Sequence, residues 1–246
     1  MVKLKSTKNI RREVRCDDWL DLAKPTTKLI EHAIDEGRLT EAKQMAYYMI
    51  PEGKSLHDLF CDWIWSFYTH IADTYGEEAV YKASRATQES WMMGRTYKAF
   101  SKMCVEEQIY LTMEIMRSHR GGPKQLGETP VIEEKDRYVL VFDPCGSGGR
   151  MRRGDPVDGT PPRTGPPYNF GVTKDPHPWS FGQKGVPYYC IHCCLNEILP
   201  MEWGGYPLWV TLYDPDPQKP CGWAFYKKPE FIPEEYFKRC GRTKPP

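Results

Sequence analysis

The sequence predicts an α+β protein in which an amino-terminal helical bundle packs on a small antiparallel β-sheet with long Pro/Gly-rich loops. The first observation is a change of composition near residue 120. Residues 1–120 hold only two of the 22 prolines, four of the 20 glycines and three of the nine cysteines. The second observation is that apolar residues recur at helical spacing before this point, whereas short aromatic and β-branched runs follow it. We therefore expect a helical region over 1–120 and a Cys/Pro/Gly-rich α+β region over 121–246 that carries the site.

Five helices are expected in the first region. Thr26 and Thr27 can cap a helix that ends at Gly37, and Thr40 opens a second that ends at Pro51. Ser55 caps a third helix over 56–76, with an apolar stripe through Leu56, Phe60, Trp63, Ile64, Phe67 and Ile71. Two more are expected over 77–94 and 96–118. Helices of this number and length fit a bundle.

Three strands are expected in the second region. The runs at 137–142, 206–213 and 221–226 are rich in aromatic and β-branched residues, and the last two are joined by a turn rich in proline and aspartate. The intervening stretch, 154–187, is dense in proline and glycine, and we expect either a lid over a site or a surface loop. A short polar helix and tail over 234–244 complete the chain.

Charge and composition exclude several classes of function. The chain has 34 basic and 33 acidic side chains, so its net charge of +1 gives no global field for nucleic acid. No stretch approaches the roughly 20 apolar residues that span a bilayer. The amino terminus has no apolar core behind its charges, so we expect a cytoplasmic protein without nucleic-acid or membrane partners. Aromatic-rich helices leave a homo-oligomer open, and the odd number of cysteines favours thiols or metal ligands over disulfides.

The first candidate site follows the strand at 137–142. Cys145 stands on a loop at the strand end, followed by Gly146, Ser147, Gly148 and Gly149. Freely oriented backbone N–H groups beside a sulfur favour an anion, either a thiolate or a developing oxyanion. Arg150 and Arg152 can clamp a substrate carboxylate. The alternative is a glycine-rich turn followed by a solvated basic loop.

The second candidate site is the segment 187–197. As a helix, it places Cys190, Cys193, Cys194 and Glu197 on one face; as a strand, it aligns Cys190, His192 and Cys194. Soft ligands of this kind suit zinc, with Cys221 as a partner from a neighbouring loop. The predicted zinc ligands are therefore Cys190, His192, Cys193, Cys194 and Cys221. Packed, reduced cysteines and a catalytic thiol without metal are the two alternatives.

Three further residues complete the candidates. His177 lies in the long loop and can serve as a catalytic base, as can His192. His57 and Cys61 stand four residues apart on the third helix, so both can meet one ion or substrate. The simpler interpretation of this pair is a capping histidine and a small buried cysteine.

The order of the parts resembles a known family. A helical region containing ADTYGEEA at 72–79, a strand that ends near a cysteine, and a second cysteine cluster with Glu197 three residues after Cys194 are similar to the L-2-amino-thiazoline-4-carboxylic acid hydrolase-like group. The resemblance covers the order of elements from about 55 to 225. It implies hydrolysis of a small ring or C–N bond, with the Cys145 loop and the Cys190–Glu197 segment flanking the site. The long proline-rich insert departs from that pattern.

The sequence thus predicts a hydrolase that acts on a small anionic organic substrate. In a zinc form, cysteines and histidine hold the ion, Glu197 moves the proton and an arginine orients the substrate. In a thiol form, Cys145 attacks carbon, His177 or His192 acts as base, and the glycine amides stabilise the charge. The alternative is a ligand-binding or regulatory protein with a structural Cys-rich zinc site.

Overall fold

The computed structural model describes residues 3–6 and 12–246. The chain has an α+β fold, as predicted. It divides into two compact units, Met1–Phe60 with Pro156–Gly159 (unit 1) and Cys61–Asp155 with Thr160–Pro246 (unit 2). The division falls inside the long helix α3 (Leu39–Tyr75), whereas the change of composition falls near residue 120. Within the described ranges, we find no helix with the length and apolarity needed to cross a bilayer.

Unit 1 is built around a buried arginine. Strands β1 (Leu4–Lys5) and β2 (Val14–Arg15) pair antiparallel, and α1 (Trp19–Leu22) and α2 (Thr26–Asp35) follow. Arg15 donates hydrogen bonds to Asp17 Oδ2 at 2.7 Å and Thr26 Oγ1 at 3.1 Å. Its remaining donors reach the carbonyls of Asp21 and Lys24 at 2.6 and 2.8 Å, so the buried charge is fully paired.

Helix α3 corrects two expectations. The predicted break at Pro51 does not occur, and the helix continues through the proline. The proline removes one backbone hydrogen bond at a cost of about 3 kcal/mol, and the helical turns on both sides offset this cost. The predicted apolar stripe is also not the buried face, since Leu56 is 59% and Trp63 is 65% exposed. Instead Cys61 and Trp65 are buried, which is a different face of the same helix.

The next helices follow the prediction with one shifted break. Helix α4 (Glu77–Thr87) continues through a π-helical turn at Gln88–Met92 into α5 (Met93–Phe100), and α6 (Val105–Ser118) follows. The break falls just before α6, at Cys104, whose backbone N–H donates to Glu107 Oε2 at 3.0 Å in a capping box.

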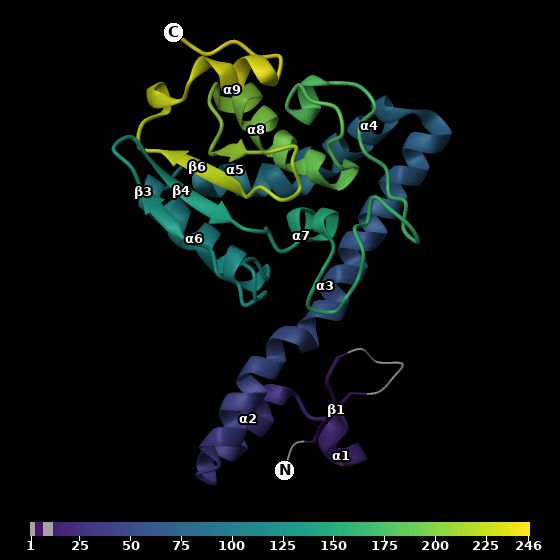
Figure 1. Ribbon diagram of the computed structural model, residues 1–246. Coiled ribbons are helices and arrows are strands. Elements are labelled where there is room, and N and C mark those ends of the chain that lie inside the picture. Colours follow the sequence, from purple (N-terminus) through teal and green to yellow (C-terminus); the bar gives the residue numbers. More distant parts are fainter. Residues whose placement is uncertain (1–2, 7–11) are drawn as a thin grey trace. The chain divides into compact units, whose positions relative to one another are not determined.

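A four-stranded antiparallel sheet forms the centre of unit 2. Its strands are β3 (Val131–Glu133), β4 (Arg137–Phe142), β5 (Val210–Leu212) and β6 (Cys221–Tyr226), in the order β3-β4-β6-β5. The strands β4, β5 and β6 confirm the three predicted runs, and β3 was not predicted. The pairing of Leu140 with Trp223 and of Val139 with Ala224 places these pairs on opposite faces. Both faces are covered, one by α5 and α6 and the other by α8 (Figure 1).

Three helices lie in the second half of the chain. Helix α7 (Gly148–Arg153) follows the glycine-rich loop, and α9 (Glu234–Arg239) lies near the carboxyl end. Between them, a 3-10 turn at Tyr188–Cys190 leads into α8 (Ile191–Gly204), so the segment after Pro187 is helical rather than extended.

Candidate functional site

Unit 2 contains a cavity of about 190 Å³ where the two predicted site segments meet. Its walls come from the end of α6, the loop between β4 and α7, the first turns of α8, and strands β5 and β6. The thiols of Cys145, Cys190, Cys193 and Cys221 line it, together with the imidazoles of His119 and His192 and the guanidinium of Arg152. The predicted residues Ser147, Gly148 and Gly149 also line it. The structure therefore brings both predicted segments to one cavity.

The two glycines that begin α7 are required by the sulfur atoms beside them. The Gly149 N–H donates to Cys145 Sγ at 2.9 Å, and a Cβ on Gly149 would lie only 2.9 Å from the same sulfur. A Cβ on Gly148 would lie 2.4 Å from Cys190 Sγ. Only glycine permits both approaches, and the Gly149 N–H is directed at the Cys145 sulfur.

Arg152 is the cation of the cavity. Its Nη atoms donate to Tyr213 Oη at 3.0 Å and Asp214 O at 2.7 Å, and Nη2 lies 3.7 Å from Cys221 Sγ. Burial lowers the pKa of the guanidinium, but Tyr213 and the neighbouring thiols outweigh this effect, so the pKa of Arg152 is raised overall. Nε is buried and has no hydrogen-bond partner among the described residues. The Nε–H group of this positively charged side chain is therefore left as a hydrogen-bond donor for a ligand.

His192 and Cys193 form a hydrogen-bonded pair. His192 Nδ1 lies 2.5 Å from Tyr189 O, and because a carbonyl only accepts, Nδ1 carries the proton. Nε2 then offers its lone pair to Cys193 Sγ at 3.4 Å. Burial lowers the pKa of His192 and raises the pKa of Cys193 well above its usual value. This pair therefore rests as a neutral imidazole and a neutral thiol.

A second histidine, His119, reaches the cavity from the end of α6. Its Nε2 lies 3.2 Å from Ser147 Oγ, and Ser147 also hydrogen-bonds the Tyr189 side chain. All three residues line the cavity. Tyr189 is in turn 3.3 Å from Cys61 Sγ, which joins this predicted residue to the wall.

Gly146 and Arg150, both predicted to bind substrate, do not line the cavity. A Cβ on Gly146 would lie 1.2 Å from His119 O, so this glycine is a backbone packing position outside the cavity. Arg150 is 1% exposed and donates to Asp155 Oδ2 at 2.6 Å and to Gly146 O. Arg150, predicted to hold the substrate carboxylate, instead forms an internal ion pair with Asp155 that fixes the loop.

Cys194 and Glu197 also face away from the cavity. Cys194 Sγ lies 3.8 Å from Cys240 Sγ, on the side of α9. The Glu197 carboxylate accepts from Thr211 N–H at 2.7 Å and from Arg239 Nη2 at 2.8 Å. Its predicted role as a proton shuttle is not supported, because its oxygens are occupied in the core. The 3-10 turn before α8 explains this: Cys190 precedes the helix, so the predicted common face is broken.

His177 is a structural residue of the long loop. Its Nε2 lies 2.7 Å from Glu77 Oε2, and its ring stacks on Trp179 at 4.2 Å between centroids. The Tyr188 hydroxyl donates to the same Glu77 carboxylate at 2.7 Å. His177 does not line the cavity, so the structure does not support it as the base. These contacts tie the 154–187 loop to α4.

His57 belongs to unit 1, where its Nδ1 contacts Asp58 Oδ1 at 3.0 Å. Cys61 belongs to unit 2 and contacts Tyr189 as described above.

The predicted zinc ligands do not form a preassembled site. Across residues 3–6 and 12–246, no three of the predicted cysteine and histidine ligand atoms lie within 4.8 Å of one another. Burial raises the pKa values of Cys190, Cys193 and Cys194, which favours the thiol form of these residues where no metal is bound. Zinc at this cluster therefore stays a prediction.

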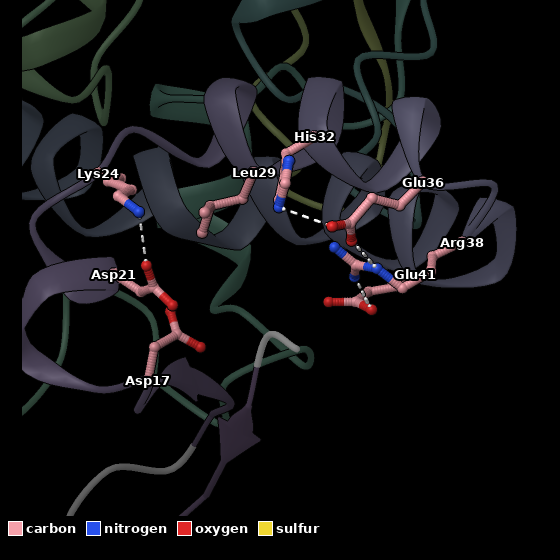
Figure 2. A pocket seen from close by; sticks show the side chains of 8 residues that line it. All are labelled: Asp17, Asp21, Lys24, Leu29, His32, Glu36, Arg38 and Glu41. Atoms are coloured by element: carbon pink, nitrogen blue, oxygen red, sulfur yellow. Dashed lines mark hydrogen bonds and ion pairs between the residues drawn. The ribbon is translucent and has the colours of Figure 1, made fainter.

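A second pocket, of about 310 Å³, lies in unit 1. In Figure 2 each basic side chain pairs with a neighbouring carboxylate, whereas Asp17 pairs with Arg15, which the figure does not draw. Lys24 contacts Asp21 at 2.7 Å, His32 contacts Glu36 at 3.1 Å, and Arg38 contacts Glu36 and Glu41. His32 is 64% exposed, so these are solvated surface pairs.

Sequence reasoning missed several residues of the cavity wall: His119, Tyr189, Asn196 and Tyr213. Asn196 stands three residues after Cys193, a spacing that places both on one helical face. Its Oδ1 is buried and has no hydrogen-bond partner in the described part of the chain. His119 had no local signal, since it reaches the site only through the packing of α6 on the sheet. No family model, curated protein or solved structure matches this chain.

Proposed function

We propose that this chain is an enzyme that hydrolyses a C–N or ring bond in a small anionic organic molecule, with Cys145 as the nucleophile. The observation that carries the proposal is the contact between Cys145 Sγ and the Gly149 N–H, at 2.9 Å, in the wall of the cavity. The thiolate is the attacking form of cysteine, and a backbone N–H aimed at the sulfur stabilises it.

The cavity supports a small substrate. Its volume of about 190 Å³ lies below the roughly 300 Å³ at which drug-sized ligand sites begin. The wall includes apolar side chains from Met92, Ile115, Phe142 and Trp223, which offer contacts to the apolar part of such a substrate.

Two buried polar atoms support an anionic substrate with a polar handle. Arg152 Nε donates and Asn196 Oδ1 accepts, and both lack partners within the described ranges. A ligand that carries an acidic oxygen and a hydrogen-bond donor satisfies both groups, which otherwise remain as buried polar atoms at a cost of about 1–3 kcal/mol each.

The proposal is tested with two alkylating probes of similar size, iodoacetate and iodoacetamide, which differ in charge. We expect both to label Cys145 faster than the exposed Cys104, and Arg152→Gln to slow iodoacetate more than iodoacetamide. Peptide mapping by mass spectrometry measures the two rates at each cysteine. If Cys145 reacts no faster than Cys104, or if Arg152→Gln slows both probes equally, the proposed nucleophile or its anion preference is wrong.

A ligand-binding or regulatory role is the second candidate, because the unpartnered atoms of Arg152 and Asn196 call for a ligand but not for chemistry. A structural Cys-rich zinc site is part of this candidate. Elemental analysis of the purified protein, followed by thermal unfolding with and without a chelator, tests it. A stoichiometric zinc content and unfolding on chelation favour this role, whereas an unchanged melting temperature and Cys145-dependent hydrolysis favour the thiol enzyme.

A further inference from the structure

We infer that His119 and Ser147 are the acid–base pair that delivers a proton to the leaving nitrogen in the reaction proposed above. This inference rests on the proposed function, since it assigns a role within the same cavity.

The geometry joins the two residues to each other and to the reacting sulfur. Ser147 follows Cys145 by two residues, is 4% exposed and lines the same cavity. Its Oγ lies 3.2 Å from His119 Nε2, within reach of a proton transfer. The Tyr189 side chain hydrogen-bonds the same hydroxyl and so fixes its direction.

The position of His119 suits exchange with solvent. It caps the end of α6 and is partly exposed, whereas Ser147 is buried. A proton can therefore enter at the imidazole and pass to the hydroxyl inside the cavity. The other histidine of the wall does not offer this, because His192 Nδ1 is bound to a carbonyl and its Nε2 faces Cys193.

The reaction balances with water as the only co-reactant. The Cys145 thiolate attacks the carbon and a C–S bond forms, while the C–N bond breaks and its electron pair stays on nitrogen. The nitrogen takes the Ser147 hydroxyl proton as Ser147 takes the proton from His119 Nε2. Water then loses a proton through Ser147 to His119 and attacks the thioester. A C–O bond forms, the C–S bond breaks, and the thiolate and the protonated imidazole are restored.

A pair of acetyl donors separates this role from a structural one. The leaving group of 4-nitrophenyl acetate departs as a stable anion and needs no proton, whereas that of 4-nitroacetanilide departs as an amine and needs one. We expect His119→Gln and Ser147→Ala to slow acylation by the anilide by about 100-fold or more, and to leave acylation by the ester, measured as the first-turnover burst of 4-nitrophenolate, within about threefold of the unmodified chain. Both variants should slow the later hydrolysis of the thioester from either substrate, because that step also passes a proton through Ser147 to His119. Ser118→Ala, beside His119 on the exposed side of α6, is the matched control and changes neither rate.

Each outcome decides the point. An ester burst of unchanged rate shows that the variants fold, so a loss of acylation rate confined to the anilide supports the pair. If the unmodified chain cleaves the ester through Cys145 but not the anilide, the proposed nucleophile stands and the acid–base pair is overturned. Equal losses of the acylation rate on both substrates overturn it as well. If Cys145→Ser retains full activity and Ser147→Ala loses it, Ser147 is itself the nucleophile and the acid–base role is overturned. If the unmodified chain cleaves neither substrate, the proposed function is overturned, and the acid–base pair with it.

Discussion

The ion pair between Glu197 and Arg239 gives the sharpest prediction for stability. Glu197 is fully buried, and Arg239 Nη2 lies 2.8 Å from each of its carboxylate oxygens. Arg239→Met removes the cation and leaves a buried charge, which costs about 3–5 kcal/mol. Glu197→Gln keeps an acceptor for Thr211 N–H and leaves Arg239, whose side chain is 19% exposed, with partial access to water. We therefore expect it to cost less than half as much.

Urea unfolding followed by tryptophan fluorescence measures the difference. With a slope of roughly 2–3 kcal/mol per M urea, a loss of about 3–5 kcal/mol lowers the midpoint by about 1–2.5 M. The double variant should recover part of the loss, because neither charge is then left alone. If Glu197→Gln destabilises the chain as much as Arg239→Met, the buried carboxylate is not the source of the cost.

The contribution of the Glu197–Arg239 pair to stability should also depend on pH. Burial raises the pKa of Glu197 above its usual value, although Arg239 opposes the shift. Because the folded state holds the proton more tightly than the unfolded state, stability from this group is present below the unfolded pKa and is lost as pH rises through the folded pKa. The penalty of Arg239→Met should therefore shrink between neutral pH and the usual glutamate range, whereas Glu197→Gln should remove this part of the pH dependence. An Arg239→Met penalty that stays constant across this range would contradict the assignment.

Two further predictions concern the glycines and thiols of unit 2. Gly148→Ala places a Cβ 2.4 Å from Cys190 Sγ and should lower the melting temperature. The control Gly165→Ala places a Cβ no closer than 3.8 Å to any neighbour and should leave the melting temperature unchanged. Equal effects of the two substitutions in thermal unfolding would refute the close approach. Burial keeps Cys194 and Cys240, whose sulfurs lie 3.8 Å apart, from oxidised glutathione, so non-reducing peptide mapping of the folded chain should find both reduced while the exposed Cys104 is modified. A Cys194–Cys240 link formed without denaturant would contradict this burial.

The fold could be predicted where local pattern decides it. The runs at 137–142 and 221–226 became neighbouring strands because both of their faces are buried, which an apolar run signals directly. The continuity of α3 through Pro51 could not be predicted, since a proline in a helical pattern predicts a break. The buried face of α3 was equally hidden, because several apolar stripes compete on one helix and only packing chooses Trp65 over Trp63.

The site was predictable to the extent that short loops decide it. The cysteine at a strand end followed by glycines marked a candidate site, and Cys145 and Ser147 of this loop line the cavity. The roles of Arg150 and Glu197 were not predictable, because a charged side chain near a site turns to whichever partner tertiary packing supplies. Asp155 and Arg239 supply those partners here.

Helix α8 shows how a costly buried pair can serve a site that it does not touch. Successive residues on a helix differ by roughly 100° in direction, so Cys193 faces the cavity while Cys194 faces α9. A rotation of α8 by one residue would exchange these two thiols and withdraw Asn196 from the wall. The Glu197 carboxylate opposes such a rotation, because turning it away from Arg239 and Thr211 N–H would leave it buried without partners. The ion pair therefore fixes the angle at which α8 presents His192, Cys193 and Asn196 to the cavity.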